Sequence, residues 1–214
     1  MDEEVSIIDT NTRNEKIKNF FINNKKNLII GFFVILVFVI GYLSITEMKV
    51  QNKIKLANQF NLTTINFKTE NKEKTIDQLT KLINENDPTY SPLALYFIID
   101  NNIVTTQKEI NELFDEILKI RKLDKEIKNL IIYKKGLLNS DFKNENDLIK
   151  ILSPVLNSNS IWKSHALFLM GEYFLGKNEK QKAKEFLEKI LILENSNPNI
   201  KLETQRLIQR ELGE

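Results

Sequence analysis

The sequence has no cysteine and only one histidine, His165. Without cysteine, the chain forms no disulfide, carries no thiolate nucleophile or thiolate metal ligand, and has no N-terminal cysteine to lipidate. One histidine is too few for a histidine-rich metal cluster or for a conventional catalytic triad with ligands to spare. We therefore expect no metal or other cofactor. We expect His165 itself to be an exposed helix residue rather than a pH sensor.

Glycine and proline are also scarce, with six and four in 214 residues, and this argues against a loop-rich β protein. The charges nearly balance, at 31 Lys and Arg against 29 Asp and Glu. No basic excess therefore suggests nucleic-acid binding. The abundant residues are Ile, Leu, Lys, Asn and Glu, which suit helices separated by Asn-rich turns.

One long apolar run is present: LIIGFFVILVFVIGYLSI, residues 28–45, contains no charged residue. An α-helix rises about 1.5 Å per residue, so the run spans roughly 27 Å, near the thickness of a bilayer core. A cleaved signal peptide is the alternative, but its apolar region usually covers only about 7–15 residues and ends in small residues. The run predicts an uncleaved transmembrane anchor at residues 28–46.

The orientation of this anchor follows from the basic residues on its two sides. Those before the run are Arg13, Lys16, Lys18, Lys25 and Lys26, and those just after it are Lys49, Lys53 and Lys55. The excess on the N-terminal side favours a cytoplasmic segment at residues 1–27. Residues 47–214 are then expected on the far side, which is the periplasm in a bacterium.

After Lys49 the apolar residues recur every three or four positions, and no alternating strand pattern persists. Turn-forming residues interrupt this pattern at 84–92, 100–102, 139–147, 157–160, 176–179 and 195–198. Thr75, Ile110, Leu148 and Ala183 mark equivalent positions, separated by 35, 38 and 35 residues. A period near 34 built from paired helices is the tetratricopeptide (TPR) signature. The predicted fold is all-α: a single N-terminal transmembrane helix and a TPR-like, right-handed helical-repeat (α-solenoid) domain of about four hairpins.

The last repeat contains GEYFLGKN, residues 171–178, which comes within one residue of the phosphate-binding pattern GxxxxGK[ST]. A P-loop must follow a strand and offer free backbone amides, but this segment is a helix-forming run with bulky side chains. We interpret Gly171 as a packing residue where two helices cross near Ala183, and Gly136 as its equivalent 35 residues earlier. Gly176 is expected to end a helix as a C-terminal cap.

Two segments resemble a known family. They are EKIKNFFINNKKNLIIGFFVILVFVIGY, residues 15–42, and LSPVLNSNSIWKSHALFLMGEYFLGKNEKQKAKEFLEKIL, residues 152–191. Both are similar to the membrane-anchored bacterial TPR-like proteins related to the ancillary subunit of the SecYEG translocon. The resemblance implies a single-pass protein of the bacterial inner membrane, without catalytic residues, that contacts the Sec translocon, exported proteins or periplasmic chaperones. Residues 60–130 depart from the family, with Asn and Thr where small alanines are expected.

Helical repeats bind partners on a concave surface built from the first helix of each pair. In the frame set by Gly136 and Gly171, the predicted protein-binding residues are Leu130, Tyr133, Leu137, His165, Phe168 and Glu172. Tyr133 and Phe168 are equally compatible with a place in the core. Trp162 is interpreted as a packing anchor at a helix start.

The sequence thus favours a non-enzymatic, membrane-anchored scaffold that binds proteins. Two alternatives stay open: a structural subunit of another membrane complex, and a receptor whose repeats face the cytosol. An enzyme is disfavoured because no paired carboxylates mark a cleft, and no small-molecule substrate or nucleic acid is indicated.

Overall fold

The computed structural model describes residues 2–104 and 106–213, with side chains from Arg13 onward, and this part of the chain is all-α. The predicted all-α fold class is therefore confirmed. The chain divides into two compact units, Met1–Leu56 and Ala57–Glu214. The predicted domain boundary at residue 47 falls inside a helix that continues past it.

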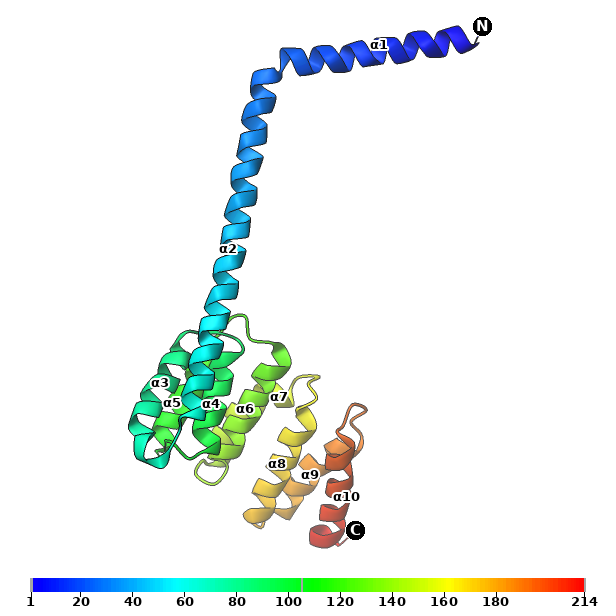
Figure 1. Ribbon diagram of the computed structural model, residues 1–214. Coiled ribbons are helices and arrows are strands. Elements are labelled where there is room, and N and C mark those ends of the chain that lie inside the picture. Colours follow the sequence, from blue (N-terminus) through cyan, green and yellow to red (C-terminus); the bar gives the residue numbers. More distant parts are fainter. Residues whose placement is uncertain (1, 105, 214) are drawn as a thin grey trace. The chain divides into compact units, whose positions relative to one another are not determined.

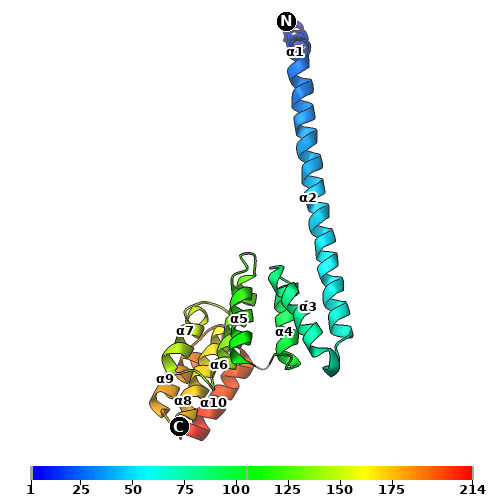
Figure 2. The ribbon, with the colours of Figure 1, turned by 90° about the vertical axis from the view of Figure 1, so that its left-hand side faces the viewer.

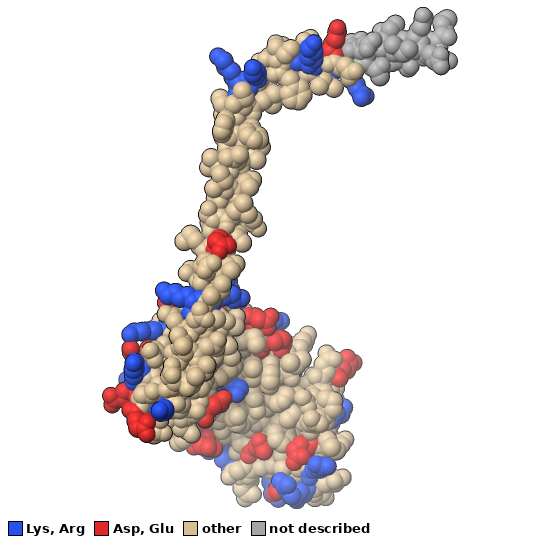
Figure 3. Space-filling view, in the orientation of Figure 1, with Lys and Arg blue, Asp and Glu red and all other residues tan. Residues whose placement is uncertain are grey.

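The first unit contains α1 (Asp2–Asn23) and most of α2 (Lys25–Ile65). Figure 3 shows a stretch of α2 that carries no charged side chain, and its apolar residues are exposed. Helix α2 is long and apolar enough to cross a membrane. The sequence produces this helix because nothing between residues 28 and 45 breaks it or adds a charge.

The second unit is a row of helices that follow one another along the chain (Figures 1 and 2). They are η1 (Thr69–Asn71), α3 (Lys72–Asn84), α4 (Tyr90–Asp100), α5 (Gln107–Leu118), α6 (Lys125–Asn139), α7 (Glu145–Leu156), α8 (Lys163–Gly176), α9 (Lys180–Leu191) and α10 (Pro198–Leu212). From α3 onward each helix packs against the next, α6 also contacts α8, and α8 contacts α10. The chain thus places α6, α8 and α10 side by side.

Each turn predicted from the sequence lies between two of these helices. Two breaks between helices were not predicted, at residues 66–68 and at residues 119–124. At residues 119–124, Lys and Arg replace the usual Asn-rich signal. The signal that was present is Asp124, whose side chain accepts the backbone N–H groups of Glu126 and Ile127. A carboxylate in this position caps a helix N-terminus.

Three helices end with an asparagine in the left-handed region: Asn86 at φ 55°, Asn102 at φ 49° and Asn178 at φ 61°. Asparagine tolerates this conformation better than other residues with a side chain. The interpretation of Gly176 as the cap of α8 is wrong, because Gly176 is the last helical residue and Asn178 takes the left-handed position.

Two tight helix crossings lie at the predicted packing glycines, Gly136 and Gly171. A Cβ atom added to Gly171 would stand 2.5 Å from Leu187 Cδ2 and 2.7 Å from its Cγ. A Cβ added to Gly136 would meet Leu152 in the same way. Both leucines are fully buried, so neither can move aside freely. Each glycine thus lets two consecutive helices approach, α8 to α9 and α6 to α7. Ala183 is buried in the adjoining core beside Phe174.

A paired amide joins α5 to α6. Asn139 is fully buried, and its Nδ2 donates to Asn111 Oδ1 at 2.8 Å while Asn111 Nδ2 donates to Asn139 Oδ1 at 3.1 Å. Gln107 Nε2 adds a bond to the carbonyl of Leu138 at 3.0 Å. Buried amides are stable only when they are hydrogen-bonded, so this pair favours one register of the two helices.

The Gly171→Leu variant is expected to lose about 1–3 kcal/mol of unfolding free energy, because the new side chain overpacks the crossing with Leu187. Gly176→Ala is the matched control in the same helix. Nothing lies within 4 Å of its added Cβ, and alanine favours a helix by up to about 1 kcal/mol over glycine. Urea unfolding of residues 47–214, which we expect to fold alone as a soluble helical domain, measures both. Equal urea midpoints for the Gly171→Leu variant and the unaltered fragment would contradict a tight helix crossing at Gly171.

Candidate protein-interaction surface

Helices α6 and α8 bring three aromatic side chains together: Tyr133, Trp162 and His165. The rings of Tyr133 and Trp162 stack, with centroids 6.0 Å apart and planes 17° apart. His165 meets Tyr133 edge-on at 5.6 Å and Trp162 at 5.0 Å. We call these three residues the aromatic cluster. Two of them, Tyr133 and His165, were predicted to share a surface, and the structure brings them into contact.

The cluster is half-buried, and burial shifts its titrating groups. The pKa of Tyr133 is raised, first by burial and then by the charge of Glu172. Burial lowers the pKa of His165, an effect that the backbone of Ile161 partly opposes. The Nδ1 of His165 is buried and has no hydrogen-bond partner in the part of the chain that the structure describes. The expectation that His165 is an exposed helix residue is wrong, because Tyr133 and Trp162 cover its ring.

Leu137 and Glu172 lie at the far end of the same two helices and line one depression of about 730 Å³. Leu137 is 48% exposed, and Phe142 in the following loop is 70% exposed. Burial raises the pKa of Glu172, and the charge of Glu203 on α10 raises it further. No Lys or Arg in the described part of the chain forms an ion pair with Glu172. The depression thus combines exposed apolar side chains with charged ones, since Asp141, Lys143 and Lys177 line it together with Glu172.

The remaining two predicted residues are less available. Phe168 is half-buried and packs against a core formed by Leu167, Leu187, Ile190, Leu207 and Ile208. Leu130 is also half-buried, one turn before Tyr133. Phe168 therefore fits the core interpretation better than the binding interpretation, because its ring holds α8 against α9 and α10.

Tyr96 is a further aromatic residue of this surface that was not predicted from the sequence, as Trp162 and Phe142 were not. Tyr96 on α4 lies under Lys134 of α6, with the Lys134 Nζ 4.7 Å from the ring centroid. Burial, with a smaller effect of Asp100, raises the pKa of Tyr96 to about 12. The signal was the repeat itself, because Tyr96 precedes Tyr133 by 37 residues. The aromatic positions therefore continue from α8 through α6 to α4.

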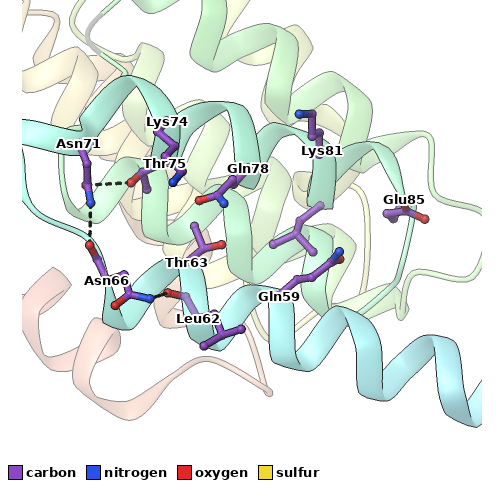
Figure 4. A pocket seen from close by; sticks show the side chains of 11 residues that line it. Gln59, Leu62, Thr63, Asn66, Asn71, Lys74, Thr75, Gln78, Lys81 and Glu85 are labelled. Carbon is purple, nitrogen blue, oxygen red and sulfur yellow. Dashed lines mark hydrogen bonds between the residues drawn. The ribbon is translucent and has the colours of Figure 1, made fainter.

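A second, polar depression of about 520 Å³ lies between the end of α2 and α3 (Figure 4). Thr63 and Thr75 are buried beside it. Asn71 links its two sides, because its Nδ2 donates to the carbonyl of Asn66 at 2.7 Å and its Oδ1 accepts from Thr75 Oγ1 at 3.1 Å. These Asn and Thr side chains make the crossing between the end of α2 and α3 polar.

In the part of the chain that the structure describes, no group of three or more His, Asp or Glu side chains could hold a metal ion. The surface of α6 and α8 offers rings, aliphatic side chains and charged groups of both signs, which together suit contact with another polypeptide.

No protein-family model matches the chain, and comparisons with curated proteins and with solved structures also found no match.

Replacing Phe168 with alanine is expected to lower the unfolding free energy by about 2–4 kcal/mol, because it empties a core contact. Leu137→Ala is the matched control, since its side chain is 48% exposed and such a change usually alters stability by less than about 0.5 kcal/mol. Tyr133→Ala should fall between the two. Denaturant unfolding of the three variants tests this order, and a Phe168→Ala protein as stable as Leu137→Ala would return Phe168 to the binding surface.

Proposed function

We propose that this protein is a membrane-anchored, non-enzymatic scaffold that binds other proteins through the α6 and α8 surface. Helix α2 anchors the chain in the membrane. The aromatic cluster and the adjoining depression at Leu137 and Glu172 receive the partner. No cofactor or small-molecule substrate takes part.

The observation that carries the proposal is the repeated helix frame beneath this surface. Thr75, Ile110, Leu148 and Ala183 are each the fourth residue of their helix, and all four are buried. The glycine-to-leucine contacts Gly136–Leu152 and Gly171–Leu187 also recur 35 residues apart. This regularity supports a TPR-like arrangement of helix pairs, and such arrangements use their inner helices to bind polypeptides.

The surface chemistry fits a protein partner better than any other ligand. Half-buried aromatic rings tend to carry much of the binding energy at protein interfaces, because they bury a large area with little loss of conformational freedom. The carboxylate of Glu172 adds a negative charge, which favours one orientation of the partner over others. A groove for nucleic acid would instead need a basic stripe.

The place of action that we propose is the bacterial inner membrane, beside the Sec translocon, with exported proteins or periplasmic chaperones as partners. The resemblance of residues 15–42 and 152–191 to the translocon-associated family supports this choice. The charge bias around the anchor supports a periplasmic second unit. A cytosol-facing receptor and a structural subunit of another complex are the competing functions, and topology and crosslinking separate them.

Topology is tested with reporter fusions at residue 60 and at the C-terminus, expressed in bacteria. We expect an alkaline phosphatase reporter to be active at both positions and a fluorescent protein that matures only in the cytoplasm to be dark. The opposite pattern would place the second unit in the cytosol and replace the translocon proposal with the receptor.

Binding is tested by introducing a photoreactive amino acid at Leu137 and, as a control, at Glu188, which is exposed on α9. Illumination of intact membranes should capture discrete partners from position 137 and few from position 188, because only the former lies on the proposed surface. Mass spectrometry then identifies the captured proteins. Equal yields at both positions would contradict the α6 and α8 surface, and no adduct at either would favour the purely structural subunit.

A further inference from the structure

The segment before the apolar run forms a second helix rather than a loose tail. Helix α1 ends at Asn23 and α2 begins at Lys25, with one turn residue, Asn24, between them. The backbone N–H and the side-chain Nδ2 of Asn24 both donate to the carbonyl of Phe20, at 3.0 and 2.9 Å. The chain bends here (Figure 1). This joint lies wholly within the first unit.

At the joint, both helices line an apolar depression of about 570 Å³. Its walls are Phe21, Ile22, Leu28, Ile29, Phe32 and Phe33, and its one charged residue is Lys25. All six apolar side chains are exposed, at 37% or more of their surface. Apolar walls with a single ammonium group are the surroundings that suit an amphiphile with an anionic head. The apolar walls would not stabilise a soluble ion, and Lys25 would not stabilise an uncharged hydrocarbon.

The residues around the depression are strongly basic. From residue 13 to residue 26 there are five Lys or Arg and one acidic residue, Glu15. Ile17, Phe20 and Phe21 lie at i, i+3 and i+4, so they share one face of α1, and all three are exposed. Basic residues attract anionic headgroups, while Phe and Ile prefer the boundary between headgroups and acyl chains.

The position of the depression along the chain also suits a lipid headgroup. The apolar run of α2 starts at Leu28, so a membrane-spanning α2 holds Lys25 and Lys26 at the level of the lipid phosphates. Residues 17–22 then meet the same headgroup layer rather than open solvent.

We propose that residues 13–33 form an anionic phospholipid site, in which Lys25 binds the lipid phosphate and the apolar walls of the depression contact the acyl chains. The other basic residues between 13 and 26 bind neighbouring headgroups, and residues 13–23 of α1 lie at the membrane surface. A phosphate on a nucleic acid shares the charge but not the acyl chains, and so leaves the walls of the depression unused. The site rests on the membrane span that the proposed function includes, but not on the protein partner.

The absence of cysteine allows a direct test in the full-length protein, because a single introduced cysteine carries the label. Ile17→Cys places an environment-sensitive fluorophore on the face shared with Phe20 and Phe21. Asn19→Cys places the same label two residues away, on the other side of the helix. Leu36→Cys, in the middle of the apolar run, reports insertion of α2. Each protein is reconstituted in vesicles of phosphatidylcholine alone or of phosphatidylcholine with about 30% phosphatidylglycerol. The anionic lipid makes the vesicle surface strongly negative.

With phosphatidylglycerol present, we expect the label at position 17 to shift to the blue and to be quenched by acyl-chain nitroxide lipids, with a much smaller response at position 19. Lys25→Gln should weaken the association of α1 with the surface about fivefold, as expected for one charge near an anionic membrane. Lys49→Gln, beyond the other end of the run, is the matched control and should leave the response unchanged.

The same response in both vesicle types, or equal responses at positions 17 and 19, would overturn the lipid site. Equal effects of Lys25→Gln and Lys49→Gln would overturn the role of Lys25. The label at position 36 separates these failures from that of the proposed function. If it lies in hydrocarbon while position 17 does not respond, only the lipid site is wrong. If it lies in water, the anchor itself is wrong.

Discussion

The architecture of the second unit depends on how closely consecutive helices approach at Gly136 and Gly171. Each helix has one apolar stripe that must be buried, and a short helix cannot bury it alone. Where glycine replaces a side chain, a leucine of the next helix fills the space against the backbone, as Leu152 and Leu187 do. The core around Phe174 and Ala183 forms because these crossings are tight. The proposed binding surface lies on α6 and α8, the two helices that carry these glycines.

Polar contacts then determine which helices pair in which register. The Asn111–Asn139 amide pair joins α5 to α6, Ser160 Oγ donates to Glu126 Oε2 at 2.6 Å where α8 begins beside α6, and Tyr173 Oη donates to the carbonyl of Lys143 at 3.1 Å. An apolar stripe alone tolerates sliding by a turn, whereas a buried polar atom without its partner is costly. These bonds therefore contribute specificity more than net stability.

Much of the fold was predictable because its signals are local. Helix stripes, Asn-rich turns and the uncharged run are read within a few residues, and α2 and most of the helix boundaries followed from them. The break at 119–124 was missed because its signal is a single capping aspartate. The cap of α8 was predicted at Gly176, but Asn178 adopts the left-handed conformation. Asparagine and glycine both tolerate this conformation, so the sequence alone does not show which of the two adopts it.

The candidate surface was predictable only in part, because side-chain burial depends on neighbours distant in sequence. Helical spacing placed Tyr133 and His165 on one face, but it could not show that Trp162 would cover them. Phe168 shares that spacing and yet packs toward α9 and α10, since α10 adds apolar side chains behind it. Tyr96 was overlooked although the repeat period reaches it. Periodicity thus identifies faces, whereas the neighbouring helices determine which residues on a face remain accessible.

The order of the helix contacts has a consequence for how the second unit forms. Apart from weaker contacts, each helix from α3 to α10 packs on elements one or two places away along the chain, as α8 does on α6, α7, α9 and α10. Contacts of short sequence separation close small loops, and chains built from them fold quickly. The second unit can therefore acquire its structure from the N-terminal end as the polypeptide emerges from a ribosome or a membrane channel. A nascent chain of this kind exposes at most the last helix or two at any moment, which shortens the time available for aggregation.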